Sequence, residues 1–232
     1  MAAPTPAITV REATVDDVPA MVDAYFSAFN GNPLNDRCFP ESSPDARAYW
    51  TNWIGGYIGV PGIHMLVALT SPPDLNPATP LPGAGTSASA SDASRIVGWA
   101  RWLRRPEPPS STPAVATTSA IYPSNSEGAL AADFFQTARD VSKRIVAGRN
   151  YWFLSMIVTR REAQRRGVGA ALMRFGVERA DEDGLIAYLN ASKSGRPLYE
   201  LFGFQVVEQS RFDELGLDMF HMIRDPKGLK GA

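Results

Sequence analysis

The sequence predicts a mixed α/β fold, with a central sheet of about seven strands flanked by helices. Strand-like apolar runs alternate with segments of helical periodicity in the order β-α-α-β-β-α-β-α-β-α-β-β. Residues 63–69 and 95–103 predict an antiparallel hairpin with a long insertion, so both pairing senses are expected in the sheet. The nearly continuous apolar run at residues 151–159 is typical of a central strand buried on both faces.

The N-terminal third predicts one strand and two helices. Residues 8–11 form the strand, and a helix opens at Thr14, which with Asp17 resembles a capping box. Apolar residues at helical spacing continue to Phe29, and the Asn-Gly-Asn-Pro stretch at 30–33 ends this helix. Residues 44–54 predict the second helix.

The C-terminal half alternates helices with strands. Residues 127–147 predict a helix that ends at Gly148, and further helices are expected at 166–182 and 196–202. Strands are expected at residues 185–189, 204–209 and 219–224. Two segments rich in Pro, Ser and Thr, 71–94 and 105–126, predict mobile loops within a single domain spanning residues 1–232.

Composition excludes several classes of protein. The 232 residues carry 23 Lys and Arg against 24 Asp and Glu, a net charge of −1 that gives no basic field for nucleic acid. The single cysteine, Cys38, allows no internal disulfide, and no Cys/His cluster has zinc spacing. The absence of a signal-peptide pattern and of a long apolar run predicts a soluble cytoplasmic protein without a membrane span or metal. The oligomeric state is not indicated.

Two glycines open the helix predicted at 166–182, where each costs about 1 kcal/mol relative to alanine. The first turn of a helix binds anions through its free N–H groups, and Gly167 and Gly169 would let a diphosphate approach the main chain closely. Side chains of Gln164, Arg165 and Arg166 add donors and charge. The alternative is a tight turn with close helix–sheet packing. A dinucleotide fingerprint fails because its third small residue is replaced by a leucine, and no P-loop motif is present.

The segment QRRGVG, residues 164–169, matches the Q/R-x-x-G-x-G/A signature of the GNAT acetyltransferases. Downstream, GRPLYELFGF at residues 195–204 resembles the L-Y-E-x-x-G-F segment of that family, at the usual distance and on the expected elements. The order of elements resembles the family from about residue 8 to residue 224. The sequence is therefore identified as similar to GNAT enzymes.

This resemblance implies acetyl-CoA as the co-substrate, with no metal. The motif's main-chain amides would hold the CoA diphosphate, and the preceding strand would bend at a bulge and pair with the pantetheine arm. A proline that the family often has after this strand is replaced by Arg161. The residues expected to bind acetyl-CoA are Ile157, Val158, Thr159, Gln164, Arg165, Arg166, Gly167, Val168, Gly169, Ala170 and Ser192.

Tyr199 matches the family tyrosine that protonates the CoA thiolate, and a phenol of pKa near 10 can donate to a thiolate. The alternative for Tyr199 is simple packing on the sheet. Ser192 falls where the family often has an arm-binding Asn; Asn190 could serve instead, and either could cap the short helix. The general base is not assigned. The candidates are His64, His221, Asp36, Glu41, Glu107, Glu127 and a water chain.

The leading hypothesis is an N-acetyltransferase that moves an acetyl group directly from acetyl-CoA to a primary amine on a small molecule or peptide. Two alternatives remain close to it: a longer acyl-CoA or a hydroxyl acceptor, and a non-catalytic acyl-CoA-binding module. A nucleotide-binding Rossmann-type protein is disfavoured by Leu172 and by the mixed strand order. Most aromatic residues of the first half are expected in the core, and the remainder are candidates for the wall of the acceptor pocket.

Overall fold

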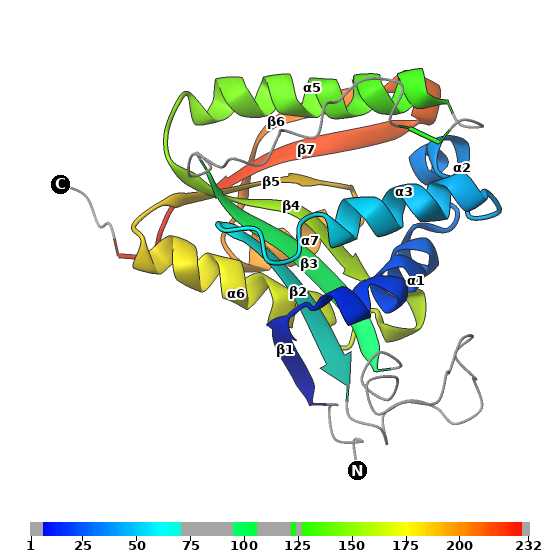
Figure 1. Ribbon diagram of the computed structural model, residues 1–232. Coiled ribbons are helices and arrows are strands. Elements are labelled where there is room, and N and C mark those ends of the chain that lie inside the picture. Colours follow the sequence, from blue (N-terminus) through cyan, green and yellow to red (C-terminus); the bar gives the residue numbers. More distant parts are fainter. Residues whose placement is uncertain (1–6, 71–94, 106–121, 124–126, 229–232) are drawn as a thin grey trace, which may run out of the picture.

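The computed structural model describes residues 7–70, 95–105, 122–123 and 127–228. Within these residues seven strands form one sheet (Figure 1). The strands are β1 (Ile8–Glu12), β2 (Ile63–Thr70), β3 (Ile96–Arg105), β4 (Tyr151–Thr159), β5 (Ile186–Ala191), β6 (Gln205–Phe212) and β7 (Leu217–Arg224).

The sheet is mixed, with the order β1-β2-β3-β4-β5-β7-β6. β4 and β5 pair in parallel, and every other neighbouring pair within the described sheet is antiparallel. The predicted hairpin is present as β2 and β3. The predicted fold class is therefore confirmed, and the parallel pair lies at the centre of the sheet.

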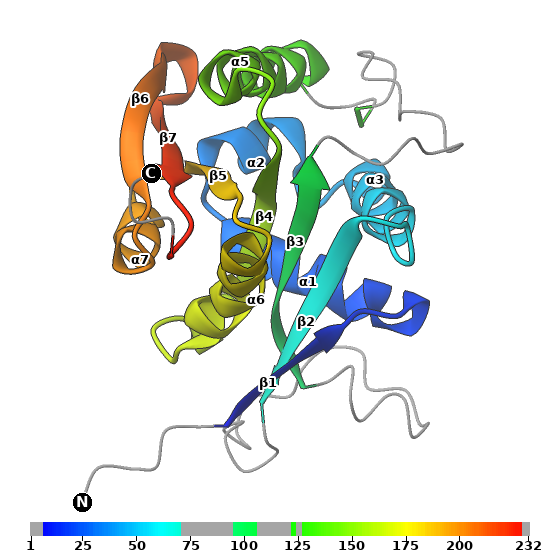
Figure 2. The same cartoon turned by 90° about the vertical axis from the view of Figure 1, so that its left-hand side faces the viewer.

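Helices cover both faces of the sheet (Figure 2). α1, α3 and α5 lie on the face that carries Val67, Trp99 and Met219, whereas α6 and α7 lie on the face that carries Ala68 and Trp102. Two aromatic-rich cores result, one on each side. The helices are α1 (Val18–Phe29), α2 (Pro33–Cys38), α3 (Pro44–Gly55), α5 (Gly128–Val146), α6 (Val168–Glu182) and α7 (Arg196–Leu201).

Turn chemistry explains where the structure departs from the sequence prediction at helix ends. The Asn-Pro pair that ends α1 also begins α2, which was not predicted, because the Asn32 side chain accepts hydrogen bonds from the N–H groups of Leu34 and Asn35. A short 3₁₀ turn separates Thr14 from α1. The helix expected from residue 166 starts at Val168, because Gly167 has a φ of +88° that α-helix excludes.

One prediction for β4 was wrong: the strand is central but is not buried on both faces. Trp152 and Leu154 are buried on the α6 side and Val158 is buried on the α1 side, but Phe153 and Met156 on that second face are only half-buried. The physical reason is that β4 is covered closely by α6 on one side and less completely on the other. No helix of the described residues is long and apolar enough to span a membrane. The segment 71–94, and 105–126 apart from Arg105, Tyr122 and Pro123, lie outside the described residues.

Candidate active site

The two central strands separate after four paired residues. Residues 151–154 of β4 pair with residues 186–189 of β5, and the rest of β4 pairs within the described sheet only with β3. Arg101 of β3 pairs with Met156 and Trp102 pairs with Leu154, so Ser155 is an extra residue in the ladder. Such a bulge bends its strand and ends regular pairing. The sequence resemblance implied a bulge in this strand, and Ser155 occupies it.

We call the resulting opening the fork: residues 155–159 of β4 on one side and residues 190–191 of β5 on the other. Ile157, Val158 and Thr159, which were predicted to pair with the pantetheine arm, line its β4 side. Ile157 and Thr159 are half-buried, but the Val158 side chain belongs to the core and is only 1% exposed. The carbonyl oxygen of Val158 also lies against Gly98 of β3. Main-chain groups alternate in direction along a strand, so those of Ile157 and Thr159 are the ones that face the fork and can pair with an extended ligand.

The 164–170 turn follows the fork and leads into α6. Its conformation depends on two positive φ angles, +64° at Arg165 and +88° at Gly167. A Cβ added to Gly167 would meet no atom within 4 Å. The side chains of Gln164, Arg165 and Arg166 are all exposed, and Gln164 donates to the carbonyl oxygen of Thr159. The turn thus combines open main chain, two guanidinium groups and the positive end of α6, which suits an anion.

Gly169 has a different role from Gly167. A Cβ at Gly169 would lie 2.8 Å from Cδ2 of Leu198, so this glycine lets α7 pack against α6. Close packing, the alternative weighed for both glycines, therefore explains Gly169, and a free approach to the main chain is available at Gly167. Val168 is 1% exposed and Ala170 is half-buried, so each offers mainly its N–H group to a ligand.

A third glycine holds the start of α6 against the fork. A Cβ at Gly98 of β3 would lie 2.5 Å from the carbonyl oxygen of Val158 and 2.8 Å from Cγ1 of Val168. Any larger residue would push the helix N-terminus away from β4. Gly98 was not singled out in the sequence, because nothing in its neighbourhood along the chain indicates which strand and helix converge on it.

Tyr199 lies on α7, beside the C-terminal end of β5. The residue is 6% exposed, its ring packs at 6.4 Å from that of Phe204, and burial raises the pKa of its phenol well above the usual value. Among the described residues no group hydrogen-bonds its hydroxyl. A Cβ at Gly195 would lie 3.4 Å from Tyr199 Oη and 3.3 Å from Ser192 Oγ, so the two side chains approach the same spot.

Ser192 is engaged in a turn. Its Oγ accepts a hydrogen bond from the N–H of Gly195 at 3.1 Å and lies 3.1 Å from Oγ of Ser194. This contact closes the turn before α7 but does not cap that helix, whose N-cap residue is Gly195 and which has no side-chain cap; the Ser192 side chain stays exposed. A contact between Ser192 and the pantetheine arm remains a prediction.

The candidate bases are dispersed. His64 stacks on Trp152, and its Nδ1 lies 2.7 Å from a carboxylate oxygen of Glu12. Glu107 lies outside the described residues. The other carboxylates have structural partners: Glu127 and Glu41 face arginines, and Asp36 accepts from the N–H of Gly31. Within the described part of the chain no three His, Cys, Asp or Glu side chains form a group that could hold a metal ion.

The sequence did not reveal a buried hydrogen-bond chain that ends at the fork. Tyr188 Oη lies 2.8 Å from Oδ1 of Asn190 and 2.8 Å from Nδ1 of His221, and His221 Nε2 lies 2.8 Å from Oγ of Ser210. Tyr188 and His221 are fully buried, whereas Asn190 is half-buried. The period-2 spacing of Tyr188 and Asn190 puts them on one face of β5, but the register with β7 is not readable from the sequence.

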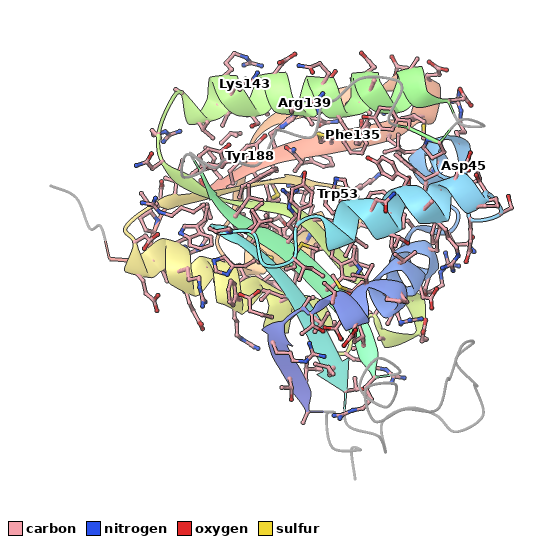
Figure 3. All side chains as sticks on the ribbon, viewed as in Figure 1. Asp45, Trp53, Phe135, Arg139, Lys143 and Tyr188 are labelled. Carbon is pink, nitrogen blue, oxygen red and sulfur yellow. The ribbon has the colours of Figure 1, made fainter. Side chains whose placement is uncertain are left out.

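Figure 3 shows Trp53 from α3, and Phe135, Arg139 and Lys143 from α5, on either side of the sheet region that carries Tyr188. We call this region the α3–α5 face. Tyr122 stacks between rings from both helices, 5.9 Å from Tyr49 and 6.5 Å from Phe135.

Beneath the same face, the Arg101 guanidinium lies 5.0 Å from the ring centroid of Trp53 and 3.6 Å from that of Tyr57. Trp50, Trp99 and Trp102 are core residues, as predicted, whereas Tyr49, Trp53 and Tyr57 are half-buried. The half-buried rings are therefore the ones available to wall an acceptor pocket.

Residues 139–225 match the family model of the acetyltransferase (GNAT) domain. This range holds β4, the 164–170 turn, α6, β5, α7, β6 and β7, together with most of the second half of α5. The region that carries the fork and Tyr199 is therefore the region that carries the family's sequence pattern. None of the curated proteins matches the sequence.

Solved structures share the fold over almost the whole chain. A histone acetyltransferase HPA2 and related acetyltransferase from Corynebacterium glutamicum is 23% identical, with a TM-score of 0.61, covering 98% of this chain and 99% of that one. A polyamine N-acetyltransferase from Drosophila melanogaster is 10% identical with a TM-score of 0.59, covering 94% and 100%. An agmatine N-acetyltransferase is 13% identical with a TM-score of 0.58, covering 94% and 99%. At these identities the likeness concerns the fold.

Proposed function

We propose that this chain, whose residues 139–225 match the GNAT acetyltransferase domain, uses acetyl-CoA and transfers its acetyl group directly to a primary amine of a small molecule or peptide. The whole chain would act as one catalytic domain. We propose that the fork and the 164–170 turn bind acetyl-CoA, and that Tyr199 is the general acid.

The observation that carries this proposal is the continuity of the fork with the turn. The free edge of β4 runs from Ser155 to Thr159 and leads within five residues to the exposed turn that begins at Gln164. An extended arm can pair with the strand edge while its diphosphate lies on the N–H groups that open α6. Few other ligands combine an amide-bearing extended arm with a diphosphate.

The reaction needs both reactants held together, a stabilised oxyanion and a proton for the leaving thiolate. Correct placement of the reactants can supply roughly 7–11 kcal/mol of the barrier. The lone pair of the amine attacks the thioester carbon and the carbonyl π pair moves to oxygen. The amine nitrogen, positively charged after the attack, loses one proton to water, and the return of the π pair breaks the C–S bond. No covalent enzyme intermediate is required.

Tyr199 supplies the proton that converts the thiolate into the free thiol of CoA. Burial keeps the phenol protonated because it raises the pKa of Tyr199. A neutral phenol beside a developing thiolate gains a charge-assisted hydrogen bond and then transfers its proton. The phenol recovers its proton from solvent after CoA has left.

The acceptor amine would reach the fork from the α3–α5 face. That face holds the half-buried rings of Tyr49, Trp53 and Tyr57, whereas α6 and α7 close the opposite face. Aromatic walls suit the apolar part of an amine substrate and exclude water from the reacting carbonyl.

Release of free thiol from acetyl-CoA, followed over a panel of amines, tests this function. The panel should include polyamines, agmatine, amino acids, amino sugars and peptides with free N-termini, with mass spectrometry to identify acetylated products. Butyryl-CoA and hydroxyl acceptors run in parallel separate the nearest alternatives. Binding of acetyl-CoA by calorimetry without turnover of any acceptor would instead support a non-catalytic module, and absence of binding would contradict the proposal.

A further inference from the structure

We propose that Asn190 is a catalytic residue whose side-chain amide donates a hydrogen bond to the thioester carbonyl oxygen of acetyl-CoA. Tyr188, His221 and Ser210 would act as positioning residues that fix the orientation of this amide. The inference rests on the function proposed above, and it assigns a role to a buried hydrogen-bond chain that the fold alone does not require.

The direction of the chain follows from the proton inventory of its members. Tyr188 has one hydroxyl proton, which it donates to Oδ1 of Asn190 at 2.8 Å. In its second hydrogen bond, Tyr188 Oη must then be the acceptor, and Nδ1–H of His221 is the donor, also at 2.8 Å. In neutral imidazole the other nitrogen is an acceptor, so Nε2 accepts from the hydroxyl of Ser210 at 2.8 Å. Every proton in the chain is thus directed toward Asn190.

This direction leaves the amide nitrogen of Asn190 unused. Its carbonyl oxygen is occupied by Tyr188, and among the described residues nothing accepts a hydrogen bond from Nδ2. Asn190 is half-buried, while its two supporting residues Tyr188 and His221 are fully buried. A side chain held by a rigid buried chain, with two N–H donors unspent at a partly open position, is prepared for an oxygen atom of a ligand.

The surroundings of His221 also favour the neutral form of its imidazole. Burial lowers the pKa of His221, and the carboxylate of Glu208, which raises that pKa, is itself held by Arg144 through two hydrogen bonds of 2.9 and 2.7 Å. The imidazole can therefore keep the single-proton arrangement that the chain requires.

The position of Asn190 matches the reactive end of the arm. Leu154 and Leu189 are the last residues paired between β4 and β5, so Asn190 is the first residue of β5 beyond the narrow end of the fork. The bulged Ser155 is its counterpart on β4. If the diphosphate lies on the 164–170 turn, the arm runs back along β4 from the wide end of the fork. The thioester, which is the end remote from the diphosphate, then lies next to Asn190.

At this place the amide assists bond formation. As the amine nitrogen bonds to the carbonyl carbon, the π electron pair moves to the oxygen, which becomes an oxyanion and accepts the Asn190 N–H more strongly. The pair returns when the C–S bond breaks, and the thiolate takes its proton from Tyr199. Asn190 itself neither gains nor loses a proton, as expected for electrostatic stabilisation.

Variants Asn190→Ala and Asn190→Asp test the contact with the substrate oxygen. Removing one such donor lowers kcat by about 10²–10³-fold in comparable sites, and we expect a loss of this order for Asn190→Ala. Asn190→Asp keeps the acceptor for Tyr188 but presents a negative charge to the oxyanion, so its kcat should fall at least as far. The Kd for acetyl-CoA, measured by calorimetry, should stay close to that of the wild type. Asn150→Asp, at an exposed position before β4, is the matched control and should keep full activity.

A second readout does not depend on turnover. The infrared carbonyl band of bound acetyl-CoA labelled with ¹³C in the acetyl carbonyl should lie at lower frequency in the wild type than in Asn190→Ala, because a donated hydrogen bond weakens the C=O bond. An equal frequency in the two proteins would overturn the proposal. A wild-type kcat in Asn190→Ala would overturn it too, as would a variant that loses affinity for acetyl-CoA without losing kcat.

Positioning by the chain is tested through Tyr188→Phe, which removes one hydroxyl and little packing. We expect kcat to fall in Tyr188→Phe but not to fall further when the change is added to Asn190→Ala, because the hydroxyl acts through Asn190. Equal losses in both backgrounds would point to a merely structural role and contradict the inference. Absence of turnover in the wild type, with the band shift intact, would contradict the proposed function and leave the Asn190 contact supported.

Discussion

Gly176 of α6 lies against the indole ring of Trp102 on β3, so closely that a Cβ at Gly176 would overlap three ring atoms. The ring cannot move aside easily, because its Nε1 donates a hydrogen bond to the carbonyl oxygen of Leu172 at 3.1 Å and Trp102 is fully buried. This contact sets how near α6, and with it the 164–170 turn, approaches the centre of the sheet.

Gly176→Ala should therefore lower the free energy of unfolding by about 1–3 kcal/mol, the usual range for overpacking a core. Urea unfolding followed by tryptophan fluorescence measures this loss. Ser142→Ala, on the partly exposed side of α5, is the control and should change stability by less than about 0.5 kcal/mol. A fully stable Gly176→Ala would mean that helix and sheet can separate without cost.

Gly167→Ala should weaken acetyl-CoA binding more than it weakens the fold. Gly167 and Gly184 both have positive φ, +88° and +65°, and a Cβ at either would meet no atom within 4 Å. Each alanine variant should lose roughly 1–2 kcal/mol of stability from the strained backbone. Only Gly167 belongs to the proposed diphosphate site, so calorimetry should show a higher Kd for Gly167→Ala and an unchanged Kd for Gly184→Ala. Equal affinities would remove Gly167 from the site.

Tyr199→Phe should lower kcat by about 10²–10⁴-fold, the usual range for a positioned general acid. The phenol ring is buried and its hydroxyl has no hydrogen-bond partner among the described residues, so stability and the Kd for acetyl-CoA should change little. Thiol release at saturating substrate measures kcat. Tyr151→Phe, a half-buried tyrosine at the start of β4, is the control. An unchanged kcat in Tyr199→Phe would exclude the acid role.

Stability should decrease in acid partly because of His221. Burial lowers the pKa of His221 below its ordinary value of 6.5, against a smaller upward effect of Glu208 and a downward effect of Arg144. Below pH 6.5 the unfolded chain therefore binds a proton that the folded chain resists. The contribution is complete above pH 6.5 and is lost as the pH falls through the interval below it.

His221→Asn removes this proton and should flatten the dependence of unfolding free energy on pH. Urea titrations at pH 7.5 and pH 5.5 should show a larger decrease in the wild type than in the variant. The same decrease in both proteins would mean that His221 does not titrate differently in the folded and unfolded states.

Local sequence determined the elements of this protein and the turn that starts α6. Within the described residues, hydrophobic periodicity predicted every strand and every α-helix except α2, because the spacing of apolar side chains shows which of them must be buried. The glycines of the 164–170 turn and the LYELFGF segment indicated the family, since motifs of this kind are contiguous along the chain. The resemblance also implied a bulged strand, although the bulged residue itself was not identified.

Tertiary structure alone decided which distant residues meet. Three features depend on strand order and register. They are the separation of β4 and β5 beyond Leu154 and Leu189, the packing of Gly169 on Leu198, and the hydrogen-bond chain from Ser210 through His221 and Tyr188 to Asn190. A single residue of slip would turn each side chain to the other face of the sheet, and no local pattern fixes that choice. The sequence therefore indicated the ligand, whereas only the fold brought together the groups that we propose to surround its reactive end.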